Sequence, residues 1–180
     1  MLKKWYVLGA LFVCSFSIIY IIFLLQQESY SKINNIQIEQ LKSAENIEIL
    51  DVKVNNEYEK PFAYVFYKRG TTLGACTLRV INKRLDYHMD LMINEDPSNP
   101  VQVFGVRTGF PYQMIQINDN KLLQEGSYIY ATFNQRKWHR LKIKAPKRSY
   151  IISGDYDEGS TGSSSVEIYN KKNQQIFDNR

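Results

Sequence analysis

Apolar and polar residues alternate along most of the chain from Ile47 onward. The clearest case is the segment LDYHMDLMI at residues 85–93. On an extended backbone, side chains at every second position share a face. One face of this segment would therefore carry the apolar side chains Leu85, Tyr87, Met89, Leu91 and Ile93. The other face would carry Asp86, His88, Asp90 and Met92. This pattern predicts a half-buried β-strand.

Similar alternation, or a composition rich in β-branched and aromatic residues, recurs between turn-forming residues. It predicts further strands at residues 47–54, 62–69, 72–81, 101–106, 113–117, 127–133, 140–145, 149–153 and 165–170. The ending VEIYNKKNQQIF predicts a final hairpin with its turn at residues 171–173. No helix of ten residues is predicted between these strands. We therefore expect a mainly β domain over residues 46–180, built as an antiparallel sandwich or an open barrel.

The N-terminal pattern is different, because residues 5–25 form an uncharged and mostly apolar run of twenty-one residues. A helix of this length spans roughly 30 Å, the thickness of the hydrocarbon core of a bilayer. No small-x-small cleavage site follows it, so we expect an uncleaved transmembrane anchor rather than a signal peptide. Lys3 and Lys4 precede the run, which predicts that residues 1–4 stay in the cytoplasm and that the C-terminal domain lies outside. The predicted location is the cell membrane, with a single pass.

Residues 26–45 are polar with scattered Ile and Leu, and we expect them to form a stalk that is partly helical. Its thin apolar stripe would comprise Ile33, Ile36 or Gln37, Gln40 or Leu41, and Ala44. The β domain contains a single cysteine, Cys76, so no disulfide can form within it. Since Cys76 lies inside a predicted strand, we interpret it as a small buried apolar residue.

Positive charge is concentrated beyond the stalk. Residues 26–60 contain four basic and seven acidic residues, whereas residues 61–180 contain seventeen and eleven. The densest basic run is RKWHRLKIKAPKR, at residues 136–148. On a strand, alternate residues of this run would form a basic stripe. Its candidate binding residues are Arg136, Lys137, Trp138, Arg140, Lys142, Lys144, Lys147 and Arg148.

Outside a cell, the anionic partners available to such a stripe are lipid headgroups, phosphate-bearing wall polymers and acidic proteins. Nucleic acid is not expected as a partner. Trp138 could add a stacking contact, whereas we expect His139 to be a spectator. The same pattern is also that of an ordinary solvated strand face that binds nothing, and this alternative remains open.

No catalytic signature stands out, because there is no Gly-x-Ser-x-Gly motif, no convincing Cys–His pair and no glycine-rich phosphate loop. Asp86, His88 and Asp90 would share one strand face and form a weak alternative metal site. In the loop at 155–167, Asp155 and Asp157 match the first ligands of a calcium loop. Gly159 and Val166, however, replace two of its later oxygen ligands, and Ser160 replaces its invariant glycine. We therefore expect a flexible surface loop, no cofactor and no enzymatic activity.

An N-terminal anchor followed by a Tyr- and Asn-rich β domain ending in YNKKNQQIF resembles the layout of small membrane-anchored, exported proteins of low-GC Gram-positive bacteria. The resemblance supports the predicted location outside the cytoplasm and transfers no functional residue.

The sequence leaves three hypotheses for the function. The first is a tethered, non-enzymatic domain that binds an envelope component or a partner protein. The second is an accessory subunit of a membrane complex, held by a small-residue face of the span formed by Gly9, Ala10, Ser15 and Ser17. The third is a metal-dependent hydrolase.

Overall fold

The computed structural model describes residues 28–160 and 163–179. The predicted anchor at residues 5–25 lies outside this range. Among the described residues, none of the helices has both the length and the apolar character that crossing a bilayer requires.

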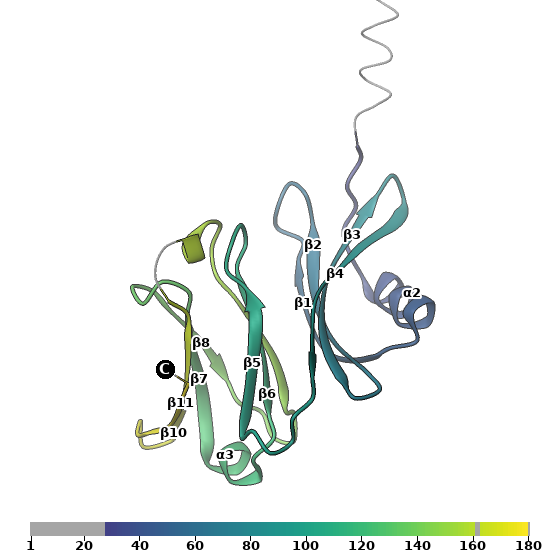
Figure 1. The fold of residues 1–180 in the computed structure, drawn as a ribbon. Helices are drawn as coiled ribbons and strands as arrows, with labels where there is room; N and C mark the ends of the chain where they lie inside the picture. The colour runs from purple at the N-terminus through teal and green to yellow at the C-terminus, as the bar shows by residue number, and fades with distance from the viewer. Residues whose placement is uncertain (1–27, 161–162, 180) are drawn as a thin grey trace, which may run out of the picture.

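Three antiparallel sheets make up most of the described chain (Figure 1). Sheet A has the order β1-β2-β3-β4 and contains consecutive strands joined by hairpins. Its strands are β1 (Glu48–Asn55), β2 (Phe62–Arg69), β3 (Thr72–Ile81) and β4 (Arg84–Asn94). The two-residue turn between β3 and β4 places Asn82 and Lys83 at φ values of 51° and 63°. Positive φ at both central residues suits the twist of a tight hairpin.

The remaining strands form sheets B and C. Sheet B has the order β5-β6-β9, with β5 (Val101–Val106), β6 (Tyr112–Ile117) and β9 (Ser149–Ser153). Sheet C has the order β11-β10-β7-β8, with β7 (Gly126–Thr132), β8 (Trp138–Lys142), β10 (Ser165–Asn170) and β11 (Gln175–Asp178). A short helix, α3 (Asn120–Glu125), links sheet B to sheet C, and the 3₁₀ turn η1 (Glu158–Ser160) precedes β10.

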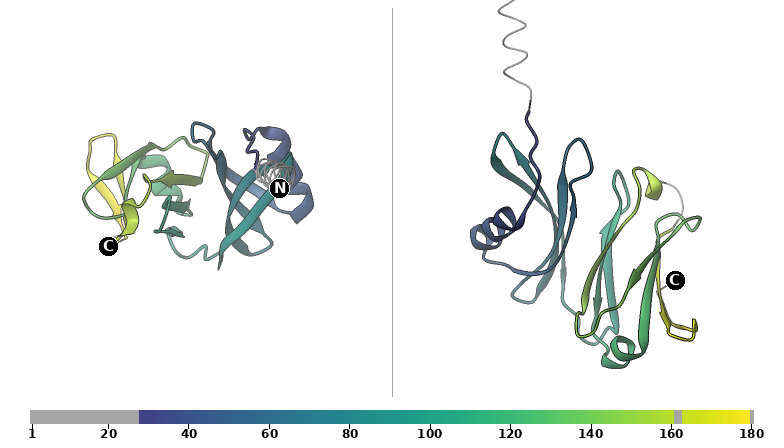
Figure 2. Two further views of the ribbon diagram at one scale, coloured as in Figure 1. Left: turned by 90° about the horizontal axis from the view of Figure 1, so that it is seen from above. Right: turned by 180° about the vertical axis from the view of Figure 1, so that it is seen from behind.

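The sheets are stacked in layers, which Figures 1 and 2 show from opposite sides. Phe66 of sheet A packs with Met114 and Ile151 of sheet B in one buried cluster. On the other face of sheet B, Ile115 packs with Ile129 of sheet C in a second cluster. The expected mainly β, antiparallel architecture is confirmed. Its form is sandwich-like, and the sheets do not close into a barrel.

Residues 28–45 belong to the segment at 26–45 for which we expected a partly helical stalk, and they pack against the outer face of sheet A. Helix α2 (Asn35–Glu45) covers this face, and its Leu41 is fully buried in a third cluster with Ile33. The predicted stripe offered Ile36 or Gln37 at its second position; Ile36 is 64% exposed, and Gln37 is partly buried. The sheet supplies the apolar partner that the isolated sequence did not reveal.

The regular alternation predicted for residues 85–93 is interrupted in the observed strand β4. Met89 pairs with Cys76, but the next pair joins Leu91 to Ala75, so Asp90 is an extra residue in a β-bulge. A bulge shifts the following side chains by one position relative to the partner strand. Leu85, Tyr87 and Met89 accordingly pack toward α2, whereas Ile93 packs toward sheet B.

Candidate functional site

The centre of the predicted basic stripe lies on β8, an edge strand of sheet C. Trp138, Arg140 and Lys142 are exposed on one face of this strand, and His139 and Leu141 are partly buried on the other. The predicted strand at 140–145 thus begins two residues earlier and ends earlier than expected, but its alternation is present. The exposed side chains belong to the face of sheet C that looks away from sheet B.

The flanking basic residues of the stripe are held elsewhere. Lys137 forms an ion pair with Asp155, and this hydrogen-bonded contact raises the pKa of Lys137 and lowers the pKa of Asp155. Lys147 lies 2.6 Å from a carboxylate oxygen of Asp51 on β1. Arg148 donates to the backbone carbonyls of Ile117 and Asn118 at 3.2 and 3.0 Å.

These three cations join parts of the fold and do not line the face formed by β8. Of the eight residues predicted as a stripe, three therefore share that face: Trp138, Arg140 and Lys142. Arg136 and Lys144 are exposed beyond the two ends of β8.

Tyrosines of β7 lie beside the cations of β8. Tyr130 is paired with Arg140 across the two strands, and Tyr128 is paired with Lys142. The guanidinium carbon of Arg140 lies 3.5 Å from the centroid of the Tyr128 ring and 5.8 Å from that of Tyr130. Stacking on an aromatic face orients a guanidinium without neutralising its charge. Neither Arg140 nor Lys142 has a carboxylate within 4 Å in the part of the chain that the structure describes.

A shallow hollow of about 340 Å³ lies next to these cations, lined by Tyr130, Trp138, Glu167, Tyr169 and Asn173. The Tyr130 and Tyr169 rings meet edge to face, with centroids 5.1 Å apart. The Tyr169 hydroxyl donates to a carboxylate oxygen of Glu167 at 2.8 Å, and Glu167 is only 5% exposed. We call this hollow together with Arg140 and Lys142 the aromatic face of sheet C.

The aromatic face combines flat rings, a carboxylate, an amide and two cations on neighbouring strands. Aromatic rings pack against the apolar faces of ligands, and polar groups at their edges determine orientation. This set of groups suits a ligand that carries hydroxyls and negative charge. The binding residues predicted from the sequence did not include these tyrosines. The alternation in SYIYATF nevertheless places Tyr128 and Tyr130 on one face and Ile129 and Ala131 on the other.

The alternative metal residues Asp86, His88 and Asp90 lie along β4 without converging. Asp90 accepts hydrogen bonds from the hydroxyls of Thr77 and Tyr112 at 2.6 and 2.9 Å. Side chains two positions apart on a strand stand side by side, separated by about 7 Å at their bases. Among the described residues, no three His, Cys, Asp or Glu side chains are grouped so that they could hold a metal ion.

The loop that begins at Asp155 is tied to β8 in the part that the structure describes. His139 places Nε2 2.8 Å from a carboxylate oxygen of Glu158, whose side chain is 5% exposed. Glu158 also accepts a hydrogen bond from the backbone N–H of Asp155 at 2.9 Å. His139, expected to be a spectator, thus anchors the first part of this loop to sheet C.

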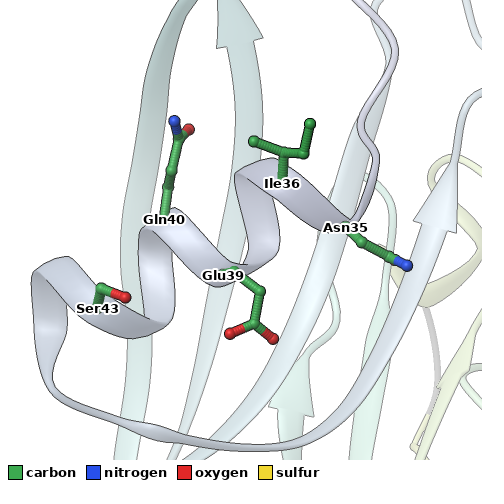
Figure 3. Close-up of a pocket in the computed structure, with 5 residues that line it drawn as sticks. All are labelled: Asn35, Ile36, Glu39, Gln40 and Ser43. Carbon is green, nitrogen blue, oxygen red and sulfur yellow. The ribbon is translucent and has the colours of Figure 1, made fainter.

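A further hollow of about 590 Å³ runs along the outer surface of α2. Figure 3 shows its five side chains spreading from the helix without pointing toward a common centre. Four of them are polar, and Ile36 is the exception. The hollow is an open helix surface with no convergent chemistry.

Comparisons of the chain with protein-family models, with curated proteins and with solved structures found no match.

Proposed function

We propose that this protein is a membrane-tethered, non-enzymatic domain that binds an anionic polymer of the cell envelope outside the cytoplasm. The observation that carries the proposal is the aromatic face of sheet C, where Arg140 and Lys142 flank a hollow lined by Tyr130, Trp138 and Tyr169. A sugar-containing polymer with phosphate or carboxylate groups matches this surface. Its ring faces would stack on the aromatic side chains, and its charges would bind the two cations.

The position of the aromatic face favours a polymer over the bilayer surface as its partner. The described chain begins beside the turn that joins β3 and β4, because Ser29 and Tyr30 contact Asn82 and Ile81. Sheet C is the layer farthest from α2, and its outer face looks sideways relative to that end of the molecule (Figure 1). A tether at residues 5–25 would thus leave this face open to polymers that surround the membrane.

The tether itself rests on the uncharged run at residues 5–25 and on Lys3 and Lys4 before it. Removal of the run should release the protein from the membrane fraction. Alkaline carbonate extraction of intact membranes tests this directly, because it retains integral proteins and releases peripheral ones. Recovery of the full chain in the soluble fraction would contradict a membrane tether.

Binding can be tested with the full chain in a non-ionic detergent and purified wall material that retains its phosphate-bearing polymers. Each cation near an anionic surface contributes about 1 kcal/mol. The double variant Arg140→Gln/Lys142→Gln should therefore reduce retention about tenfold or more. Trp138→Ala should also reduce it, because that change removes one wall of the hollow. High salt should weaken retention of the unmodified chain.

The matched control is Lys171→Gln/Lys172→Gln, which removes two exposed cations from the turn between β10 and β11. It lowers the net charge equally but leaves the aromatic face intact, so retention should change little. Equal losses in both double variants would indicate nonspecific attraction and contradict the proposal. Retention that survives chemical removal of the anionic polymers from the wall would contradict it as well.

A further inference from the structure

A separate cavity, of about 390 Å³, lies between sheets A and B. Its wall contains an aromatic cluster contributed by both sheets and by two loops: Phe62, Tyr64, Phe110, Tyr112 and Tyr156. Phe110 contacts Phe62 and Tyr156 at centroid distances of 5.2 and 5.1 Å, and Tyr64 lies 4.4 Å from Tyr112. Tyr156 is 67% exposed, so one side of the cluster is open to solvent. Cavities of this size and lining hold small apolar or amphiphilic ligands.

The polar groups among these rings form hydrogen bonds within the protein. The Asp90 bulge brings its carboxylate to the hydroxyls of Thr77 and Tyr112. The Tyr64 hydroxyl donates to the carbonyl of Phe110 at 2.7 Å. Burial, reinforced by the Asp90 charge, raises the pKa of both Tyr64 and Tyr112, so both hydroxyls remain protonated donors at neutral pH. The interior thus offers ring surfaces rather than unpaired polar atoms.

The Asp90 carboxylate, which accepts the hydrogen bonds of Thr77 and Tyr112, is part of the cavity lining. Two cations, Lys60 and Arg79, also line the cavity. Neither has a carboxylate within 4 Å among the residues that the structure describes. Lys60 lies over the ring of Tyr30, 5.1 Å from its centroid, and Arg79 is exposed on β3. Glu28 and Glu59 line a neighbouring hollow with Lys60 and do not line this cavity. A mainly aromatic interior, whose Asp90 carboxylate is hydrogen-bonded to two hydroxyls, and a cationic rim are together complementary to an apolar chain that ends in a negative group.

The cavity lies at the end of the molecule where the described chain begins. Tyr30 pairs with Ile81 at the end of β3, and the Ser31 N–H donates to the carbonyl of Val80. If the span ends at Leu25, two residues separate it from Glu28, and an extended chain covers at most about 3.6 Å per residue. The cationic rim would then be close to the bilayer surface.

We infer that the cavity between sheets A and B binds one anionic amphiphile, with its apolar chain among the aromatic rings and its headgroup at Lys60 and Arg79. The chemistry is shared by an anionic membrane lipid and by a free fatty acid. The proposed tether makes a lipid of the adjacent leaflet the nearer source, and this part of the inference rests on the proposed function. The site is separate from the aromatic face of sheet C.

The experiment uses the full chain reconstituted in phosphatidylcholine nanodiscs with two photoreactive probes. One probe is phosphatidylglycerol with a diazirine in its acyl chain, placed in the bilayer. The other is dodecanoate with the same group, added in solution. After irradiation, mass spectrometry should find both probes attached to peptides that contain residues 58–64 and 106–112. Lys60→Gln/Arg79→Gln should lower the labelling of these peptides about thirtyfold, since each cation contributes about 1 kcal/mol.

The control Lys83→Gln/Arg84→Gln removes two exposed cations at the same end of the molecule, one in the β3–β4 turn and one at the start of β4, and it should leave labelling unchanged. Thr108→Trp alters an exposed residue that lines the cavity and should reduce labelling by narrowing the entrance. Labelling by dodecanoate alone would support the site while removing the membrane as its source. Labelling that is equal in all variants, or absent from both peptides with both probes, would overturn the inference.

Discussion

Asp90 illustrates how a single residue alters a strand. Its bulge interrupts the pairing of β3 with β4, so side chains after Met89 exchange faces. The Asp90 carboxylate accepts hydrogen bonds from the Thr77 and Tyr112 hydroxyls and forms part of the wall of the cavity between sheets A and B. The same bulge also explains why Leu91 and Ile93 do not continue the apolar row that contains Leu85 and Tyr87.

Cys76 leads to a prediction at the same scale. It is fully buried between sheet A and α2, and burial raises the pKa of its thiol to about 12. At pH 8 only about one thiol in ten thousand would be ionised, because each pH unit below the pKa lowers the thiolate fraction tenfold. In a Cys14→Ser variant, iodoacetamide should leave Cys76 unmodified in the folded protein and modify it after unfolding in urea. Rapid alkylation of the folded protein at pH 8 would contradict this burial.

At the scale of elements, α2 is stabilised by its cap and by its contact with sheet A. Asn34 accepts a hydrogen bond from the N–H of Ile36, and Gln37 accepts one from the N–H of Asn34, which completes a capping box. At the other end, Glu45 accepts hydrogen bonds from Tyr87 and Arg69, both at 2.6 Å. These contacts, led by the bond from Tyr87, lower the pKa of Glu45. The stability that they contribute is present above the ordinary pKa of Glu45 and is lost as the pH falls through its lowered value.

The contact of α2 with the sheet can be measured by Leu41→Ala. Leu41 is fully buried, and deletion of a buried leucine side chain costs about 2–5 kcal/mol. The free energy of unfolding from urea titration should fall by this amount. Ile36→Ala, on the exposed side of the same helix, should change it by about 0.5 kcal/mol or less. Equal and small effects of both changes would mean that residues 28–45 behave as a solvated stalk.

At the scale of the whole molecule, sheet A and the sandwich of sheets B and C are joined by buried side chains and by polar contacts across the layers. Asp51 of β1 accepts the backbone N–H of Ile151 on β9 at 3.0 Å and pairs with Lys147. Phe66 and Phe104 meet edge to face across the same boundary, with centroids 5.6 Å apart. Because the layers share this core, we expect them to unfold together.

Asp51→Ala tests this connection. The change leaves the N–H of Ile151 without its acceptor and Lys147 without its carboxylate. It should lower the free energy of unfolding by about 1–3 kcal/mol and preserve a single transition in urea. Asp86→Ala is the matched change at an exposed position of the same sheet and should have little effect. A second transition in the Asp51 variant would show that the layers can unfold separately.

The sequence by itself determined where most strands lie and which residues of β8 are exposed, because both follow from local alternation and turn residues. Tertiary structure alone decided the partners of these strands. It removed Lys137, Lys147 and Arg148 from the basic stripe by pairing them with groups on other elements, and it added Tyr130, Tyr169 and Glu167 from neighbouring strands. The physical reason is that a binding face or cavity is formed by side chains from segments far apart in the chain, and their distances depend on sheet order and layer packing, which local patterns do not encode.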